Sequence, residues 1–161
     1  MRDEITISKD GRGYRLFTRT ALPQPLDVVF PFFADAKNLD ELTPPFLNFR
    51  IVTPDPIEMK VGALIDYKLR MRGLPISWRT EITAWEPPHR FMDVQLRGPY
   101  RWWRHEHRFV SKGDKTIVED EVSYGVPLGV LLHPLFIKRD LLNIFHYRLS
   151  RMHTLFDDAG R

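Results

Sequence analysis

The middle of the chain alternates apolar and polar residues over several consecutive segments. In LIDYKLRM, residues 64–71, apolar side chains occupy every second position, and Asp66, Lys68 and Arg70 fall between them. A period of two is typical of a β-strand that buries one face. The same pattern runs through LNFRIVT (47–53), ISWRTEITAW (76–85), RFMDVQLR (90–97), RWWRHEHRFV (101–110) and TIVEDEVSY (116–124). These segments predict a meander of about six antiparallel strands with one apolar face.

Shorter elements precede this meander. Ile5 and Ile7 indicate a short strand, which turns at Gly-Arg-Gly into a strand over YRLFTRTAL, residues 14–22. Pro25 is expected to open a helix over VVFPFFAD, because proline suits a first helical turn. Asp35 is expected to cap a second helix over AKNLDELT, because aspartate is a favoured N-cap residue. Two short helices therefore follow this first stretch of strand.

The pattern turns helical after Pro127. Apolar residues then recur at steps of three and four, at Leu135, Leu142, Phe145, Leu149, Met152 and Phe156. This spacing predicts one long C-terminal helix with an apolar face that can cover the sheet. The predicted fold class is α+β, with a curved antiparallel sheet of about six or seven strands wrapped around that helix.

Composition and charge narrow the possible partners. A chain of 161 residues is expected to form one domain, residues 1–161. Without cysteine it can form neither disulfides nor cysteine-ligated zinc. Its 24 basic and 21 acidic residues are interspersed, so we expect no nucleic-acid partner.

The longest apolar stretch, residues 126–137, is too short to span a bilayer and contains two prolines. With no signal-peptide pattern at the N-terminus, we expect a cytoplasmic protein without integral membrane association; a homodimer stays open.

Three segments resemble a known superfamily. FFADAKNLDELTPP (32–45), residues 56–91 and DVQLRGPYRWWRHEHRF (93–109) are similar to the START-like, helix-grip (SRPBCC) proteins, which include the polyketide cyclase/dehydrase and coenzyme Q-binding groups. Bacterial ligand-binding SRPBCC proteins resemble the chain most, over about residues 18–148. The resemblance implies a deep apolar cavity between sheet and helix that binds a small hydrophobic molecule. It implies neither a particular ligand nor a cofactor.

Two histidines in WWRHEHRF are the main candidates for chemistry. Strand alternation puts Trp103, His105 and His107 on the more apolar face and Glu106 on the opposite face. Both histidines are therefore expected to face the cavity. A His-Glu-His metal site has poor geometry, since the glutamate points away, and two histidines need a third ligand from a neighbouring strand. We expect no metal site.

Asp120 is the best candidate partner for these histidines. It shares a face with Val118 and Val122, and a carboxylate among apolar neighbours needs a compensating partner. The resulting imidazole–carboxylate pair is open to three interpretations. It can satisfy buried polar groups or orient a ligand, it can exchange protons in catalysis, or it can contribute to a metal site.

The positions of Asp93 and Gln95 depend on the turn that follows them. A three-residue turn over 98–100 places Asp93 opposite His105 and Gln95 opposite Trp103, whereas a two-residue turn reverses the face. The family resemblance favours the three-residue turn and keeps Gln95 on the ligand side. Both residues are therefore expected to contact the ligand.

Aromatic side chains are expected to form the cavity wall. Tyr67 and Trp78 lie on the inward faces of their strands, Trp103 lies beside the histidines, and Phe145 lies on the apolar face of the C-terminal helix. Each would supply an apolar surface, and tyrosine and tryptophan add a polar tip. The alternative for Tyr67 and Trp78 is that each only fills the core.

The sequence leaves three candidate functions open. The first is binding of a small aromatic, polyketide-like or isoprenoid molecule. The alternative is a cyclase, aromatase or dehydratase in which His105 or His107 exchanges protons, tuned by Asp120 or Asp93. The third is delivery of a lipid or quinone at a membrane surface, with residues 126–137 as a docking lip followed by Lys138.

Overall fold

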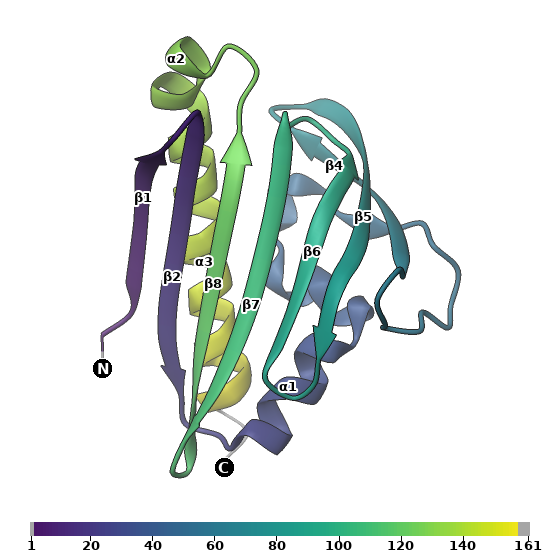
Figure 1. Cartoon of the computed structure of the whole chain (residues 1–161), viewed down its shortest axis with the longest axis vertical. Coiled ribbons are helices and arrows are strands. Elements are labelled where there is room, and N and C mark those ends of the chain that lie inside the picture. Colours follow the sequence, from purple (N-terminus) through teal and green to yellow (C-terminus); the bar gives the residue numbers. More distant parts are fainter. Residues whose placement is uncertain (1, 158–161) are drawn as a thin grey trace.

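The computed structural model describes residues 2–157 and shows an open antiparallel sheet curved around one long helix (Figure 1). The sheet has eight strands in the order β1-β2-β8-β7-β6-β5-β4-β3. The strands are β1 (Glu4–Asp10), β2 (Gly13–Leu22), β3 (Arg50–Ile51), β4 (Leu64–Met71), β5 (Leu74–Glu86), β6 (Arg90–Arg97), β7 (Trp102–Lys112) and β8 (Lys115–Gly125). This is the predicted α+β helix-grip fold, with slightly more strands than expected.

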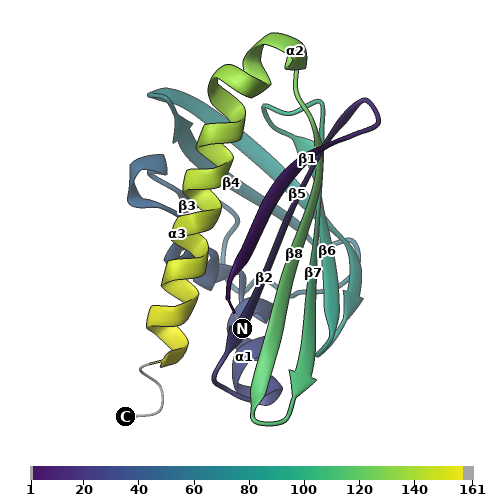
Figure 2. The same cartoon turned by 90° about the vertical axis from the view of Figure 1, so that its left-hand side faces the viewer.

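The helices lie in two groups. Between β2 and β3 the chain forms α1 (Leu26–Ala34) and the 3₁₀ turns η1 (Ala36–Leu42) and η2 (Pro45–Leu47). After β8 it forms α2 (Gly129–Leu132), a π-helical turn η3 (His133–Ile137) and α3 (Lys138–Asp157) without a break. Figure 2 shows α3 running along the concave side of the sheet. No helix in residues 2–157 is long and apolar enough to cross a bilayer.

Local chemistry explains several element boundaries. The Asp35 carboxylate accepts a hydrogen bond from the Lys37 backbone N–H at 3.0 Å, which is the predicted cap, although the capped element is a 3₁₀ helix.

The strand expected over 47–53 is reduced to the two residues of β3. Prolines carry the preceding 3₁₀ turn through Leu47, and Asn48 is left-handed at φ 46°, so the extended pairing begins only afterwards.

The π-helical turn also changes which helical residues are buried. Leu135 is exposed and Leu142 is only half-buried, whereas Leu141 is buried in the core. A π turn adds one residue to a turn, so the residues before it face differently from those after it. The predicted face is therefore correct from Phe145 onward and wrong at its start.

The core consists of two apolar clusters separated by a polar layer. One cluster contains Trp103 and Val122 with Phe145, and the other contains Phe109 and Val118 with Met152. On each of β7, β8 and α3 the residues between these two sets are polar, namely His105 and His107, Asp120, and Arg148. The layer thus follows from strand alternation and helical spacing within three aligned elements.

Candidate functional site

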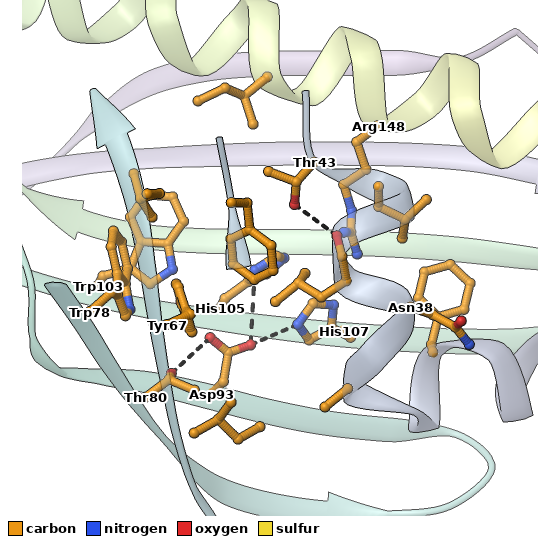
Figure 3. A pocket seen from close by; sticks show the side chains of 18 of the residues that line it. Asn38, Thr43, Tyr67, Trp78, Thr80, Asp93, Trp103, His105, His107 and Arg148 are labelled. Carbon is orange, nitrogen blue, oxygen red and sulfur yellow. Dashed lines mark hydrogen bonds and ion pairs between the residues drawn. The ribbon is translucent and has the colours of Figure 1, made fainter. Parts of the chain in front are cut away.

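A cavity of about 200 Å³ lies between the sheet and α3. Its wall is mainly apolar and comes from the β4–β7 strands, the α1–η2 region and α3. Among the residues predicted to bind a ligand, Tyr67, Trp78, Asp93, Trp103, His105, His107 and Phe145 line it. The polar layer forms one part of this wall (Figure 3).

Asp120 lies at the centre of the polar layer and is completely buried. Its Oδ1 accepts hydrogen bonds from His105 Nε2 at 3.1 Å and His107 Nδ1 at 2.8 Å. Its Oδ2 accepts one from Arg148 Nε at 2.9 Å. The predicted pairing of Asp120 with the histidines is therefore present in the structure, and α3 adds a cation to it.

Asp93 approaches the histidines from the cavity side. Strand pairing places it opposite His105, as a three-residue turn predicts. Its Oδ2 accepts a hydrogen bond from His107 Nε2 at 2.8 Å and lies 4.0 Å from His105 Nδ1. Thr80 Oγ1 donates to its Oδ1 at 3.3 Å (Figure 3). His107 thus bridges two carboxylates, one on each ring nitrogen.

These contacts shift the pKa values of the two histidines in opposite directions. Burial and the nearby charge of His107 lower the pKa of His105. Burial also acts to lower the pKa of His107, but hydrogen bonds to Asp120 and Asp93 outweigh it and raise the pKa above its usual value. The carboxylate on each ring nitrogen therefore favours the protonated form of His107, whereas burial favours the neutral form of His105.

The two carboxylates remain ionised for a related reason. Burial alone would raise the pKa of Asp120, but the Arg148 charge and the histidine hydrogen bonds hold it well below its usual value. Burial likewise opposes ionisation of Asp93, and the hydrogen bond from His107 lowers its pKa. The two buried carboxylates are thus compensated by the Arg148 guanidinium and by hydrogen bonds from the histidines.

A second polar feature lies among the aromatic residues of the wall. Trp78 is buried, and its indole Nε1–H has no hydrogen-bond partner within residues 2–157. Its ring stacks on Tyr67, with the centroids 5.8 Å apart, and meets the edge of Trp103 at 5.5 Å. An unpartnered buried donor costs free energy unless a bound group accepts its hydrogen bond.

Comparison with known proteins agrees with this architecture. Residues 22–144 match the family described as "Polyketide cyclase / dehydrase and lipid transport". The chain belongs to this family. No curated protein matches the sequence.

Solved structures share the fold at low sequence identity. Protein Ms6760 from Mycobacterium smegmatis is 16% identical, with a TM-score of 0.70 over 97% of this chain and 99% of that one. A point mutant of norcoclaurine synthase from Thalictrum flavum, solved with a transition-state analogue, is 13% identical with a TM-score of 0.67 over 98% of this chain and 99% of that one. Major latex-like protein 151 from Panax ginseng is 14% identical with a TM-score of 0.66 over 91% and 99%. At these identities the similarity establishes the fold alone.

Gln95 was also expected to bind the ligand, but its side chain faces the turn that follows β6. Its Nε2 donates to the Tyr100 carbonyl at 2.9 Å, and its Oε1 accepts from the Tyr100 N–H at 3.3 Å. The side chain packs against Gly98, where an added Cβ would lie 2.3 Å from Oε1. Gln95 therefore holds the turn closed and does not line the cavity, so the expected ligand contact is corrected.

Arg148 is the functional candidate that the sequence analysis missed. It is buried on α3, lines the cavity and contacts Asp120. It lies three residues after Phe145 and four before Met152, on the apolar face of the helix. A basic residue within an apolar stripe was the available signal, because a buried cation requires a buried anion.

Asp93, His105 and His107 also form the group most suited to a metal ion in residues 2–157. Each offers one ligand atom, and these atoms lie within 4.8 Å of one another. Asp93 supplies the carboxylate from a neighbouring strand that two histidines would need. Its hydrogen bond to His107 is 2.8 Å long, so a cation would have to displace the shared proton. Glu106 points away and pairs with Arg90 and Arg108, as strand alternation predicts.

Proposed function

We propose that the protein binds a small, mainly aromatic molecule that carries a hydrogen-bond acceptor such as a carbonyl oxygen. The observation that carries this proposal is an apolar cavity lined by Trp78, whose buried indole Nε1–H has no hydrogen-bond partner among residues 2–157. Pockets of this kind bind through apolar contact and select through a few polar groups. Membership in a polyketide cyclase/dehydrase and lipid transport family supports the same class of ligand.

The wall favours planar ligands. Trp78 and Trp103 meet edge to face, and the Tyr100 ring lies 4.7 Å from that of Trp103. Full burial of one phenyl-sized group in such a wall contributes about 1.5–3 kcal/mol. A hydrogen bond from the indole to a ligand oxygen adds about 0.5–1.5 kcal/mol, which is a several-fold gain in affinity.

Two matched probes test this proposal. Acetylnaphthalene and ethylnaphthalene have similar size, but only the ketone accepts a hydrogen bond. Isothermal titration is expected to show binding of both, with the ketone bound several-fold more tightly. In the Trp78→Phe variant, which keeps an aromatic ring, the two affinities should become equal. A folded protein that binds neither probe would contradict the proposal.

A second candidate function is acid–base catalysis of the dehydratase or cyclase type. It is favoured by the opposite pKa shifts of His105 and His107, because such a separated pair can act as base and acid near neutral pH. For a β-hydroxy ketone, neutral His105 would accept the α proton. The His107 Nε2–H, which now donates to Asp93, would turn to the leaving hydroxyl and give it a proton, so that the double bond forms and water leaves.

Hydrogen–deuterium exchange separates catalysis from binding. If His105 acts as a base, the methyl protons of acetylnaphthalene should exchange with D₂O faster with the enzyme than in buffer, as followed by proton NMR. His105→Gln should return exchange to the buffer rate while ethylnaphthalene still binds. Exchange at the buffer rate with the wild-type protein would leave binding as the only supported function.

A further inference from the structure

An exposed apolar surface covers one end of the molecule. Leu128 is 73% exposed, Val130 88%, Leu131 64% and Leu135 64%, and Phe136 beside them is 41% exposed. These five residues, here called the apolar cap, belong to α2, η3 and the residue preceding α2. Scattered exposed apolar residues are common. Several of them within nine positions form a patch, and such a patch usually contacts a membrane or another molecule.

The apolar cap is held firmly from its inner side. His133 is buried, its ring stacks on Tyr14 at 3.4 Å, and its Nε2 lies 2.9 Å from the Tyr124 hydroxyl. Leu132, between the exposed positions, and Ile137, directly after them, pack against the core. The outward direction of the cap residues is therefore fixed by packing of their neighbours.

Basic residues concentrate around the cap. Figures 1 and 2 show α2, the β1–β2 turn and the β4–β5 hairpin at the same end of the molecule. The backbone N–H of Arg101, in the β6–β7 turn, donates to Gly125 just before the cap. Residues 9–13, 70–74, 97–101 and 126–140, which form this end, contain eight of the 24 basic residues and two of the 21 acidic ones. The rest of the chain has more acidic than basic residues, so the molecule is electrically polarised along its length.

One of the two acidic residues at this end is already neutralised. Asp140 accepts two hydrogen bonds from Arg72, at 2.8 and 2.9 Å. The same guanidinium lies 4.6 Å from the centre of the Phe136 ring. The β4–β5 hairpin is thereby tied to the cap. The remaining basic residues of this end are exposed and are here called the basic rim: Lys9, Arg12, Arg70, Arg97, Arg101, Lys138 and Arg139.

We propose that the apolar cap and its basic rim dock on an anionic phospholipid surface. Apolar side chains can enter the boundary between head groups and acyl chains, while each nearby Lys or Arg gains about 1 kcal/mol from anionic lipid. A second copy of this chain is the less suitable occupant, because pairing two caps would bring two basic rims together. Docking at the membrane surface requires no membrane-spanning helix.

The docking face adjoins the cavity. Met71 and Tyr100, which belong to the turns of this end, line the cavity, as does Leu141 directly after Asp140. A docked molecule would therefore present the nearby end of its cavity to the bilayer. Exchange of an apolar ligand with the bilayer rests on the proposed function, but docking itself does not.

Vesicle flotation tests docking with matched variants. The wild-type protein should float with vesicles of phosphatidylcholine mixed with phosphatidylglycerol and much less with phosphatidylcholine alone. Val130→Asp with Leu131→Asp should lower the partition coefficient about tenfold or more, since two apolar contacts are lost. The control, Val52→Asp with Val110→Asp, changes valines of 49% and 51% exposure outside the cap and should float like the wild type. Circular dichroism checks that each variant is folded.

A charge variant tests the rim separately. Arg12→Gln with Lys138→Gln and Arg139→Gln should weaken flotation on anionic vesicles, and added salt should weaken that of the wild type. Equal flotation on neutral vesicles, or flotation unchanged by the cap variant, would overturn the proposal. Absence of vesicle binding would overturn it as well, and a dimer in sedimentation velocity that the cap variant dissociates would then identify a second copy of the chain as the occupant.

Discussion

Asp120 determines how the polar layer is organised. Its two oxygens accept from His105, His107 and Arg148, so one carboxylate joins β7, β8 and α3. Because Asp120 is fully buried, removing its charge leaves Arg148 unpaired in an apolar interior. The orientation of both histidines toward the cavity depends on the same carboxylate.

The Asp120→Asn variant should be strongly destabilised. We expect a loss of about 3–5 kcal/mol in the free energy of unfolding, because a buried cation loses its anion. Urea denaturation measures the change. Asp66→Asn, which breaks the exposed pair with Arg79, is the control and should have little effect. Similar losses in the two variants would show that Asp120 is not the centre of the layer.

The charge of His107 should appear as a pH dependence of stability. The pKa of His107 is raised above its ordinary value of 6.5, so its charge stabilises the fold fully below that pH. This contribution is lost as the pH rises through the raised pKa. The difference in unfolding free energy between the wild type and His107→Gln should therefore shrink as the pH rises from below 6.5 through the raised pKa. A difference that is constant or grows with pH would contradict an imidazolium at this position.

At the level of elements, the alternation of apolar and polar residues along the strands predicted most of the inward-facing residues correctly. The inward positions of His105 and His107 on β7 and of Asp120 on β8 follow from a period of two, and the structure agrees. The three-residue turn correctly placed Asp93 opposite His105. Alternation assigns a face to every residue of a strand, so a few aligned strands were enough to predict the polar layer.

Side-chain contacts between elements were harder to predict. Gln95 faces its turn because its amide pairs with both backbone groups of Tyr100, a local contact that alternation does not describe. Arg148 was missed because the helical pattern was assigned from apolar residues alone. The buried face predicted for the start of the helix was wrong because the π turn at His133–Ile137 changes the helical period.

Gln95→Leu should separate a turn role from a ligand role. The variant loses two side-chain hydrogen bonds to the Tyr100 backbone, so we expect a loss of about 1–2 kcal/mol in unfolding free energy. The affinity ratio of acetylnaphthalene to ethylnaphthalene should remain that of the wild type, since Gln95 does not line the cavity. Thermal or urea unfolding and isothermal titration measure the two effects. Loss of the ratio with unchanged stability would restore Gln95 to the ligand side.

At the scale of the whole molecule, the docking surface, the cavity and the polar layer lie one after another along the length of α3. The apolar cap and basic rim occupy one end, the cavity lies behind them, and the polar layer separates the two core clusters further along α3. This order would let an apolar molecule enter at the capped end and present its polar group to the Trp78 side of the wall.

The most direct test of ligand binding uses the four tryptophans as reporters. Trp78 and Trp103 line the cavity, whereas Trp85 packs in the other core cluster and Trp102 covers Gly13 and Gly125 outside the cavity. Nitrogen-15 NMR resolves indole N–H signals, so acetylnaphthalene can be titrated while all four are followed. We predict that the signals of Trp78 and Trp103 shift and saturate while those of Trp85 and Trp102 stay in place. Shifts confined to Trp85 or Trp102, or no shift at all, would contradict binding in this cavity.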